Sequence, residues 1–234
     1  MKIAIMQPYF MPYLGYFQLI NSVDKFVFYD DANFIKQGWI NRNNILLNQE
    51  KHRFFLPIKN SSSNKTIKQT IVSETPKNWQ KPLLKKIEFA YQKTPYFDAV
   101  YPWLGKILRG CVGRSMADVA IESIEQTLDY TGTEKTLLRS AEKYQNKHLK
   151  LTEKVVDICQ KEGASTYINA NGGQNLYCRN LFLEHNIELR FIKPILKTYR
   201  HSAPNFVAGL SILDVLMHND PSVIREMLND YTLI

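Results

Sequence analysis

IAIMQPYFMPYLGYF, residues 3–17, is the stretch from which the fold of this chain is predicted. Residues 3–6 form a short apolar run with the length of a buried strand. Pro8 and Pro12 then exclude a helix, whereas the apolar residues around Gly15 favour one. The stretch therefore predicts a strand, a tight loop and the start of a helix. Open α/β sheets bind ligands at such junctions, where unpaired backbone N–H groups and the positive end of a helix dipole meet.

A second strand is predicted at residues 25–29, directly after this helix. It runs into a polar segment with interspersed aromatic residues, 30–43. Because the two strand exits are so close along the chain, we expect them to form two walls of one site.

Apolar periodicity predicts the other elements. Further strands are expected at residues 44–47, 53–57, 66–72, 136–139, 166–168 and 188–192. Helices are expected over about eight residues from Tyr13 and at residues 79–91, 96–108, 115–128, 149–162, 174–185, 206–217 and 221–228. This alternation predicts an α/β fold with a mainly parallel sheet. We predict one α/β domain over residues 1–234, with a β-hairpin flap at 44–75 and a helical subdomain at 78–129.

The formal net charge of +8 favours anionic ligands, and a phosphate-bearing small molecule is one interpretation, with simple solubility as the alternative. The basic residues are scattered and form no nucleic-acid-binding motif, so no nucleic-acid partner is expected. No signal segment and no apolar run of about 20 residues occurs, which predicts a cytoplasmic protein without a membrane span. A homo-oligomer is compatible with the sequence.

The cysteines and histidines predict no metal site. Cys111, Cys159 and Cys178 are odd in number and widely spaced, and we expect reduced, packed thiols. The five histidines lack the spacing of metal ligands.

A second strand-loop-helix junction is expected in YINANGGQNLY, residues 167–177. Gly172 and Gly173 would let the backbone approach an anion, although an ordinary glycine turn explains them equally well. Tyrosines such as Tyr13 and Tyr16 suit a pocket that stacks a nucleobase or a sugar, whereas Phe10 is expected in the core.

Several phrases resemble one known family. QPYFMPYLGYFQLI (7–20), FVFYDDANF (26–34) and GWINRNNI (38–45) are similar to the signature of the WbqC-like family, bacterial proteins associated with surface-polysaccharide (O-antigen) gene sets. The similarity extends through AYQKTPYF, YINANGGQNLY and FVAGLSILDVL. It implies modification of an amino sugar during polysaccharide assembly. The implied partners are a nucleotide-linked amino sugar and an amino-acid or acyl donor.

The opening is also similar to the HIGH-type nucleotide-binding folds, such as pantothenate synthetase. Tyr13-Leu14-Gly15-Tyr16 has the spacing and the glycine of their His-x-Gly-His tetrad, with both histidines replaced by tyrosine. This resemblance implies a Rossmann-like, nucleotidyltransferase-like sheet, with ATP and Mg²⁺ as cofactors in amide formation. Asp30 and Asp31 would then orient Mg²⁺ or the attacking amine, and Arg42 would offset phosphate or carboxylate charge. Tyrosine cannot carry the charge of imidazolium, which argues against ATP activation.

Two groups of residues are therefore predicted to form the site. The candidates for catalysis are Gln7, Asp30, Asp31 and Arg42. The candidates for binding substrate or nucleotide are Tyr9, Tyr13, Gly15, Tyr16, Asn33, Trp39, Asn41, Asn43, Gly172, Gly173, Tyr177, Tyr199 and His201. The structural alternative is that the aspartates cap a loop and Arg42 pairs with one of them.

The predicted function is enzymatic modification of a nucleotide-linked amino sugar by amide formation, as an aminoacyl or acyl transferase or an ATP-dependent ligase. The alternatives are a glycosyl- or nucleotidyl-transferase and a non-catalytic nucleotide-sugar-binding protein.

Overall fold

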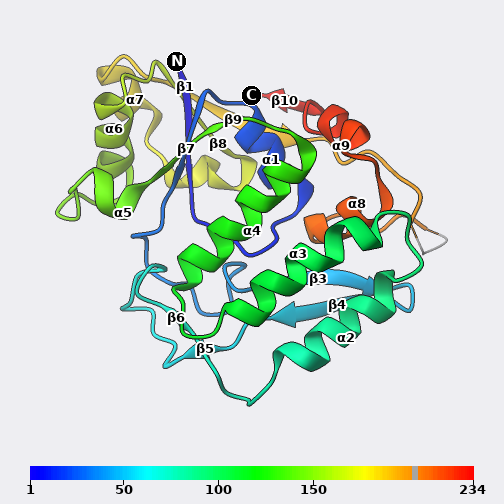
Figure 1. Cartoon of the computed structure of the whole chain (residues 1–234). Coiled ribbons are helices and arrows are strands. Elements are labelled where there is room, and N and C mark those ends of the chain that lie inside the picture. The colour runs from blue at the N-terminus through cyan, green and yellow to red at the C-terminus, as the bar shows by residue number, and fades with distance from the viewer. Residues whose placement is uncertain (202–204) are drawn as a thin grey trace.

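Strand β1 (Lys2–Met6) lies inside a six-stranded sheet with the order β10-β9-β8-β1-β2-β7 (Figure 1). The computed structural model describes residues 1–201 and 205–234. The other strands of the sheet are β2 (Lys25–Phe28), β7 (Thr136–Arg139), β8 (Thr166–Ala170), β9 (Glu188–Pro194) and β10 (Tyr231–Leu233). All neighbouring pairs are parallel except β9 and β10. The predicted α/β fold with a mainly parallel sheet is thus confirmed.

The paired strands end at the same level of the sheet. The register of β1 with β2 runs from Ile3↔Lys25 to Met6↔Phe28, and the Tyr29 N–H donates to the Met6 carbonyl at 2.8 Å. The residues after both strands therefore leave the sheet side by side.

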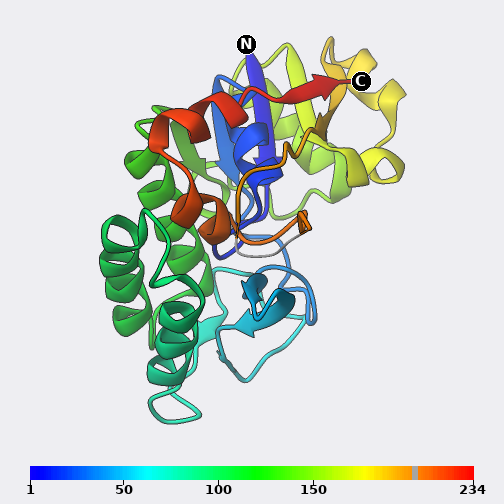
Figure 2. The same ribbon diagram turned by 90° about the vertical axis from the view of Figure 1, so that its right-hand side faces the viewer.

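Helices cover both faces of the sheet (Figures 1 and 2). They are α1 (Leu14–Asn21), α2 (Gln80–Tyr91), α3 (Phe97–Gly110), α4 (Met116–Thr131), α5 (Ser140–Lys143), α6 (Leu151–Lys161), α7 (Arg179–Glu184), α8 (Ile212–His218) and α9 (Pro221–Met227). Alternate residues of β1 enter different cores, as the two-residue period of a strand requires. Ala4 packs with α1, α4 and the C-terminal helices, whereas Ile3 and Ile5 pack with α6 and α7.

A hairpin lies beyond the carboxyl end of β1, beside helices α2 and α3 (Figures 1 and 2). Its strands are β3 (Arg42–Leu47) and β4 (Glu50–Phe55), followed by the short pair β5 (Ile58–Lys59) and β6 (Ile71–Val72). Asn48 and Gln49 both have positive φ, the geometry of a two-residue hairpin turn. Hairpin residues and helical residues of 78–129 belong to one hydrophobic cluster with the sheet.

Three predicted elements need correction. The strand expected at 66–72 is reduced to β6, because the Thr70 hydroxyl donates to the Thr66 carbonyl and folds this segment into a turn. The helix expected at 174–185 is divided into a 3-10 helix, η1 (Asn171–Leu176), and α7, with extended backbone at Tyr177 and Cys178.

The helix expected at 206–217 begins only at Ile212, since Gly209 has a φ of 72° and Ser211 caps the helix with its hydroxyl. Residues 202–204 lie outside the described part of the chain. The antiparallel strand β10 was not predicted. No helix among the described residues is long and apolar enough to cross a membrane.

Candidate functional site

A cavity of about 460 Å³ opens at the carboxyl ends of β1 and β8. The strand order reverses here, since β2 and β7 follow on one side of β1 whereas β8 and β9 lie on the other. Open α/β sheets bind their ligands at this kind of topological switch point. We call it the switch-point cavity, and its walls include Gln7, Tyr9, Tyr29, Gly172, Gly173 and Tyr177.

Gly172 and Gly173 line this cavity, and the structure explains the need for glycine differently at the two positions. A Cβ on Gly173 would lie 3.0 Å from Nδ2 of Asn169 and 3.5 Å from the Tyr177 ring, so glycine lets η1 pack tightly on β8. A Cβ on Gly172 would meet no atom within 4 Å. Gly172 therefore leaves part of the cavity wall open, as close approach of a ligand to the backbone requires.

Two tyrosines hold Gln7 in position directly after the carboxyl end of β1. The Tyr16 hydroxyl donates to the Gln7 carbonyl at 2.9 Å, and the Tyr9 hydroxyl donates to Gln7 Oε1 at 3.4 Å. Tyr16 is buried and does not line this cavity, so it meets the cavity only indirectly, through its hydrogen bond to Gln7. Gln7 lines the cavity, and its amide nitrogen remains available as a hydrogen-bond donor.

The tyrosines of the cavity are hydrogen-bonding groups rather than bases. Burial, with a further contribution from Tyr13, raises the pKa of Tyr9 to about 12. Burial raises the pKa of Tyr29 and Tyr177 as well, and for Tyr29 the negative charge of Asp31 adds to the effect. The hydroxyls therefore keep their protons at neutral pH.

Asp31 and Lys154 form a buried ion pair beside the cavity. Lys154 Nζ lies 2.6 Å from Asp31 Oδ2 and 4.7 Å from the centre of the Tyr29 ring. The Ser140 hydroxyl contacts Asp31 Oδ1 at 2.6 Å and Asp30 Oδ1 at 3.2 Å. Both oxygens of Asp31 thus already have a partner within the chain.

A second cavity of about 270 Å³ lies beyond Tyr9, which lines both cavities. Tyr13, Trp39 and Asn43 form its other main walls, and we call it the aromatic cavity. Trp39 is 49% exposed and carries the guanidinium of Arg53 at 5.9 Å from its ring. Flat aromatic walls with polar tips suit a sugar or a base.

Gly15 explains the position of Tyr13. A Cβ on Gly15 would lie only 2.4 Å from the Tyr13 ring, so the ring packs directly on this glycine. Of the Tyr-Leu-Gly-Tyr segment, Tyr13 therefore forms a wall of the aromatic cavity, and Gly15 leaves the space for its ring.

Asn43 holds the loop between β1 and α1. Its Nδ2 donates to the Met11 carbonyl at 2.6 Å, and its Oδ1 accepts from the Asn44 N–H at 2.8 Å. The Ser211 hydroxyl donates to the same carbonyl at 2.7 Å, and the Met11 N–H donates to Ser123 Oγ at 3.1 Å. Met11 is thereby kept at a φ of 46°, an uncommon value for a residue with a side chain.

Asn41 and Arg42 line a third cavity, of about 380 Å³, between the loop after β2 and the hairpin. Phe34 and Lys36 face this cavity, whereas Ile35 between them faces the switch-point cavity. Asn33 is exposed and bridges to Thr66 on the surface. Gln7 and Tyr177 thus share one cavity, whereas Arg42 lines another.

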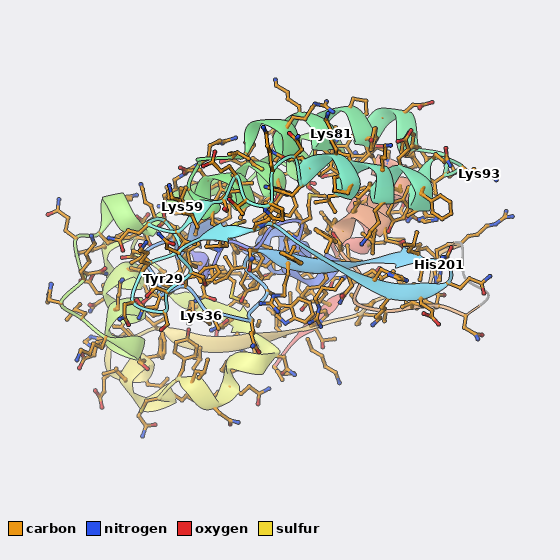
Figure 3. All side chains as sticks on the ribbon, turned by 90° about the horizontal axis from the view of Figure 1, so that it is seen from below. Tyr29, Lys36, Lys59, Lys81, Lys93 and His201 are labelled. Atoms are coloured by element: carbon orange, nitrogen blue, oxygen red, sulfur yellow. The ribbon has the colours of Figure 1, made fainter. Side chains whose placement is uncertain are left out.

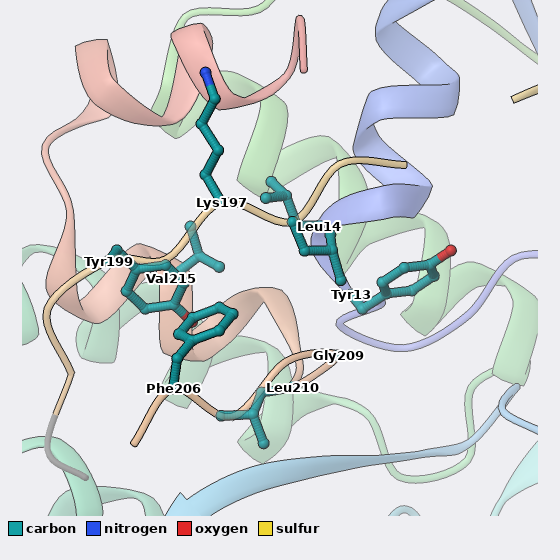
Figure 4. Close-up of a pocket in the computed structure, with 9 residues that line it drawn as sticks. Tyr13, Leu14, Lys197, Tyr199, Phe206, Gly209, Leu210 and Val215 are labelled. Carbon is teal, nitrogen blue, oxygen red and sulfur yellow. The ribbon is translucent and has the colours of Figure 1, made fainter. Parts of the chain in front are cut away.

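Tyr199 and His201 lie in a separate cluster. The Tyr199 hydroxyl donates to Asp214 Oδ2 at 2.7 Å, and Tyr91 donates to Asp214 Oδ1 at 3.0 Å. Figure 4 shows Tyr199 beside Phe206 at a void of only about 10 Å³, room for a single water molecule. In Figure 3, His201 and Tyr29 lie at opposite ends of the molecule.

Sequence reasoning missed Tyr29, Asn169, Ser140 and Lys154 as parts of this region. Tyr29 and Asn169 stand at the ends of strands that were predicted, so their position at a strand exit was a usable signal. Lys154 lies 123 positions from Asp31, and nothing local to helix α6 indicates that pairing.

A model of the WbqC-like protein family matches residues 7–226 of the chain. The chain belongs to this family. It is also 27% identical over 219 residues to the uncharacterized protein Rv1507c of Mycobacterium tuberculosis, and the match covers 93% of each protein. No solved structure matches the chain.

The WbqC-like match begins at Gln7, the first residue after β1, and includes almost all the walls of the three cavities. The predicted family is thus confirmed. The similarity to nucleotidyltransferases stays a prediction.

Proposed function

We propose that this WbqC-like protein is an enzyme of bacterial surface-polysaccharide (O-antigen) biosynthesis that acts on a nucleotide-linked amino sugar. The reaction would form an amide between the amino group of the sugar and an amino acid or another small acyl group.

The observation that carries this proposal is the pair of cavities that meet at Tyr9. The switch-point cavity lies where Rossmann-like sheets hold nucleotides, and the strand order 3-2-1-4-5 of its five parallel strands is that of dinucleotide-binding folds. The aromatic cavity offers Tyr13 and Trp39 to a sugar face. A ligand with its nucleotide in the first cavity and its sugar in the second would pass Tyr9.

The residues of the two cavities supply binding and orientation. Gln7 would donate through its amide to the ligand, and Gly172 would allow a phosphate to approach the backbone. ATP remains part of the proposal as the activator of the acyl group. Both carboxylate oxygens of Asp31 already have a partner within the chain, and no step is assigned to the metal.

One observation favours a second candidate, a nucleotide-sugar-binding protein without catalysis. Asp31 is neutralised by Lys154, and the tyrosines keep their protons at neutral pH, so these groups are poor general bases. Product formation distinguishes the two candidates.

The test is thermal stabilisation by nucleotide-linked amino sugars, by their counterparts without the amino group, and by ATP with Mg²⁺. A ligand that binds only the folded state stabilises it by about 2.7 kcal/mol at a hundredfold excess over its dissociation constant. Mass spectrometry of mixtures with amino acids and acyl donors then detects an amide.

Gly172→Val is the informative variant, because Gly172 lines the cavity and a Cβ built on it would meet no atom within 4 Å. We expect normal stability and at least a tenfold loss of sugar-nucleotide affinity, about 1.4 kcal/mol. Gly110→Val is the matched control, since Gly110 also faces open space but lies at the end of α3. If all nucleotides fail to stabilise the wild-type protein, or if both variants bind equally well, the proposal is wrong.

A further inference from the structure

The third cavity is built differently from the other two. It is bounded by the loop after β2, by the start of β3 and by residues 55–61, and its volume is about 380 Å³. Its apolar walls include Phe34, Pro57 and Ile58, and its polar walls include Asn41 and Arg42. The volume therefore suits a small molecule with both an apolar and a polar part.

The charge at this cavity is positive. Arg42 and Lys36 line it, and none of the lining residues in the described part of the chain is acidic. Burial lowers the pKa of Arg42, and the positive charge of Arg53 on the neighbouring strand lowers it further. Lys36 and Lys59 lie at the same end of the molecule in Figure 3. The cavity therefore attracts an anion.

Two residues that line the cavity each have a buried polar atom without a partner within residues 1–201 and 205–234. The first is Asn41 Oδ1, on a residue that is only 8% exposed. Its orientation is settled because Asn41 Nδ2 donates to the Leu56 carbonyl at 2.8 Å, a contact that only the nitrogen can make. The second is the Nε–H of Arg42. Buried polar groups are rarely left without partners, so each of these atoms calls for a partner that the described part of the chain does not supply.

We propose that the third cavity binds a small organic acid that carries a hydroxyl or an ammonium group on the carbon next to its carboxylate. Arg42 would bind the carboxylate through its guanidinium, with Lys36 adding charge. Asn41 Oδ1 would accept a hydrogen bond from the neighbouring hydroxyl or ammonium group. Phe34 and Ile58 would contact the rest of the acid.

The use of this acid as the acyl component rests on the proposed function, whereas its binding does not. Ile35 and Lys36 are consecutive and face the switch-point cavity and the third cavity respectively. The loop between β2 and β3 would thus contact both substrates.

Isothermal titration calorimetry of the full chain, without nucleotide, tests the site with matched pairs of acids. The probes are glycolate against acetate and 3-phenyllactate against 3-phenylpropanoate, with glycine and phenylalanine as the amino counterparts. Glycinamide lacks the carboxylate. We expect at least one hydroxy or amino acid to bind about tenfold or more tightly than its counterpart without that group, and no binding of glycinamide.

Arg42→Gln should weaken binding of the best acid by at least about tenfold. Lys36→Gln should weaken it as well, and this second variant keeps the test valid if Arg42→Gln disturbs β3. Arg53→Gln is the matched control, because Arg53 pairs across the same hairpin but does not line the cavity; we expect a change of about threefold or less. The proposal is overturned if no acid binds, if the matched acids bind equally, or if neither cavity variant weakens binding.

The outcome is separable from that of the proposed function. Acid binding without stabilisation by any sugar nucleotide would keep this site and remove the proposed function. Stabilisation by sugar nucleotides without acid binding would keep the proposed function and remove this site.

Discussion

At the scale of single residues, the exit of β2 is dominated by the ion pair of Asp31 and Lys154. Their side chains are 4% and 7% exposed, and Ser140 contacts both aspartates. A buried carboxylate that loses its partner is costly, whereas an apolar replacement of the whole pair is often tolerated. The role of Asp31 in catalysis stays a prediction, but its role in packing α6 against the sheet edge is open to direct measurement.

We predict that Lys154→Met lowers the free energy of unfolding by about 3 kcal/mol in urea denaturation, because it leaves Asp31 buried and unpaired. The double variant Asp31→Asn with Lys154→Met should regain most of this loss. Lys161→Met is the control on the same helix, since its pair with Asp157 is partly exposed, at 45% and 25%, and it should cost about 0.5 kcal/mol. Equal losses for the two lysine variants would refute this account.

At the scale of secondary-structure elements, hydrogen bonds from one strand and two helices hold the loop between β1 and α1. Asn43 of β3, Ser211 at the start of α8 and Ser123 of α4 all hydrogen-bond the backbone of Met11. Ser211 also caps α8 by accepting from the Leu213 N–H at 3.3 Å. Because the loop carries Tyr9 and Tyr13, these contacts set the shape of the aromatic cavity.

We predict that Ser211→Ala costs about 2 kcal/mol in denaturant unfolding, since it removes a helix cap and a buried hydrogen bond. It should also weaken binding of any ligand in the aromatic cavity. Asp220→Ala removes the cap of α9 and its contacts with Ser222 and Tyr96, none of which reaches the aromatic cavity, so it should leave ligand binding unchanged. A ligand affinity that both variants leave intact would contradict the proposed link between α8 and the cavity.

At the scale of the whole molecule, Glu162 joins the sheet to the helical layer on one face. Burial alone would raise its pKa, but hydrogen bonds from Lys143, Lys25 and Tyr144 outweigh that effect and hold the pKa at about 2, below the ordinary 4.5. A lowered pKa in the folded state means that Glu162 contributes stability above pH 4.5. This contribution is lost as the pH falls from about 4.5 to 2.

We therefore predict that the wild-type protein loses up to about 3 kcal/mol of stability over that interval through this residue alone. Glu162→Gln should be less stable at pH 7 and should show a smaller change with pH in urea unfolding between pH 5 and 3. Glu122→Gln is the comparison, because its pair with Arg114 is partly exposed and contributes little. Parallel pH profiles of wild type and Glu162→Gln would show that the carboxylate has no such role.

The local pattern of apolar residues was sufficient to predict most strands of the sheet. The apolar runs before Gln7 and Asp30, and the strand before Asn171, were predicted within one or two residues, because a buried parallel strand needs a continuous apolar run. The sequence did not predict β10, and it predicted one helix at 174–185 where the structure has η1 and α7. A three-residue strand at a sheet edge and a break at Tyr177 leave no periodic signal.

The sequence by itself determined the α/β class, the family, and the group of polar and aromatic residues that follow β1, β2 and β8, because strand exits are local features of a chain. Only the tertiary structure decided how these residues divide among cavities. Arg42 and Asn41 face a third cavity, Tyr199 is bound to Asp214, and Lys154 neutralises Asp31. Each of these outcomes depends on contacts between segments that are distant in the sequence, and side-chain types alone do not encode which distant partner is met.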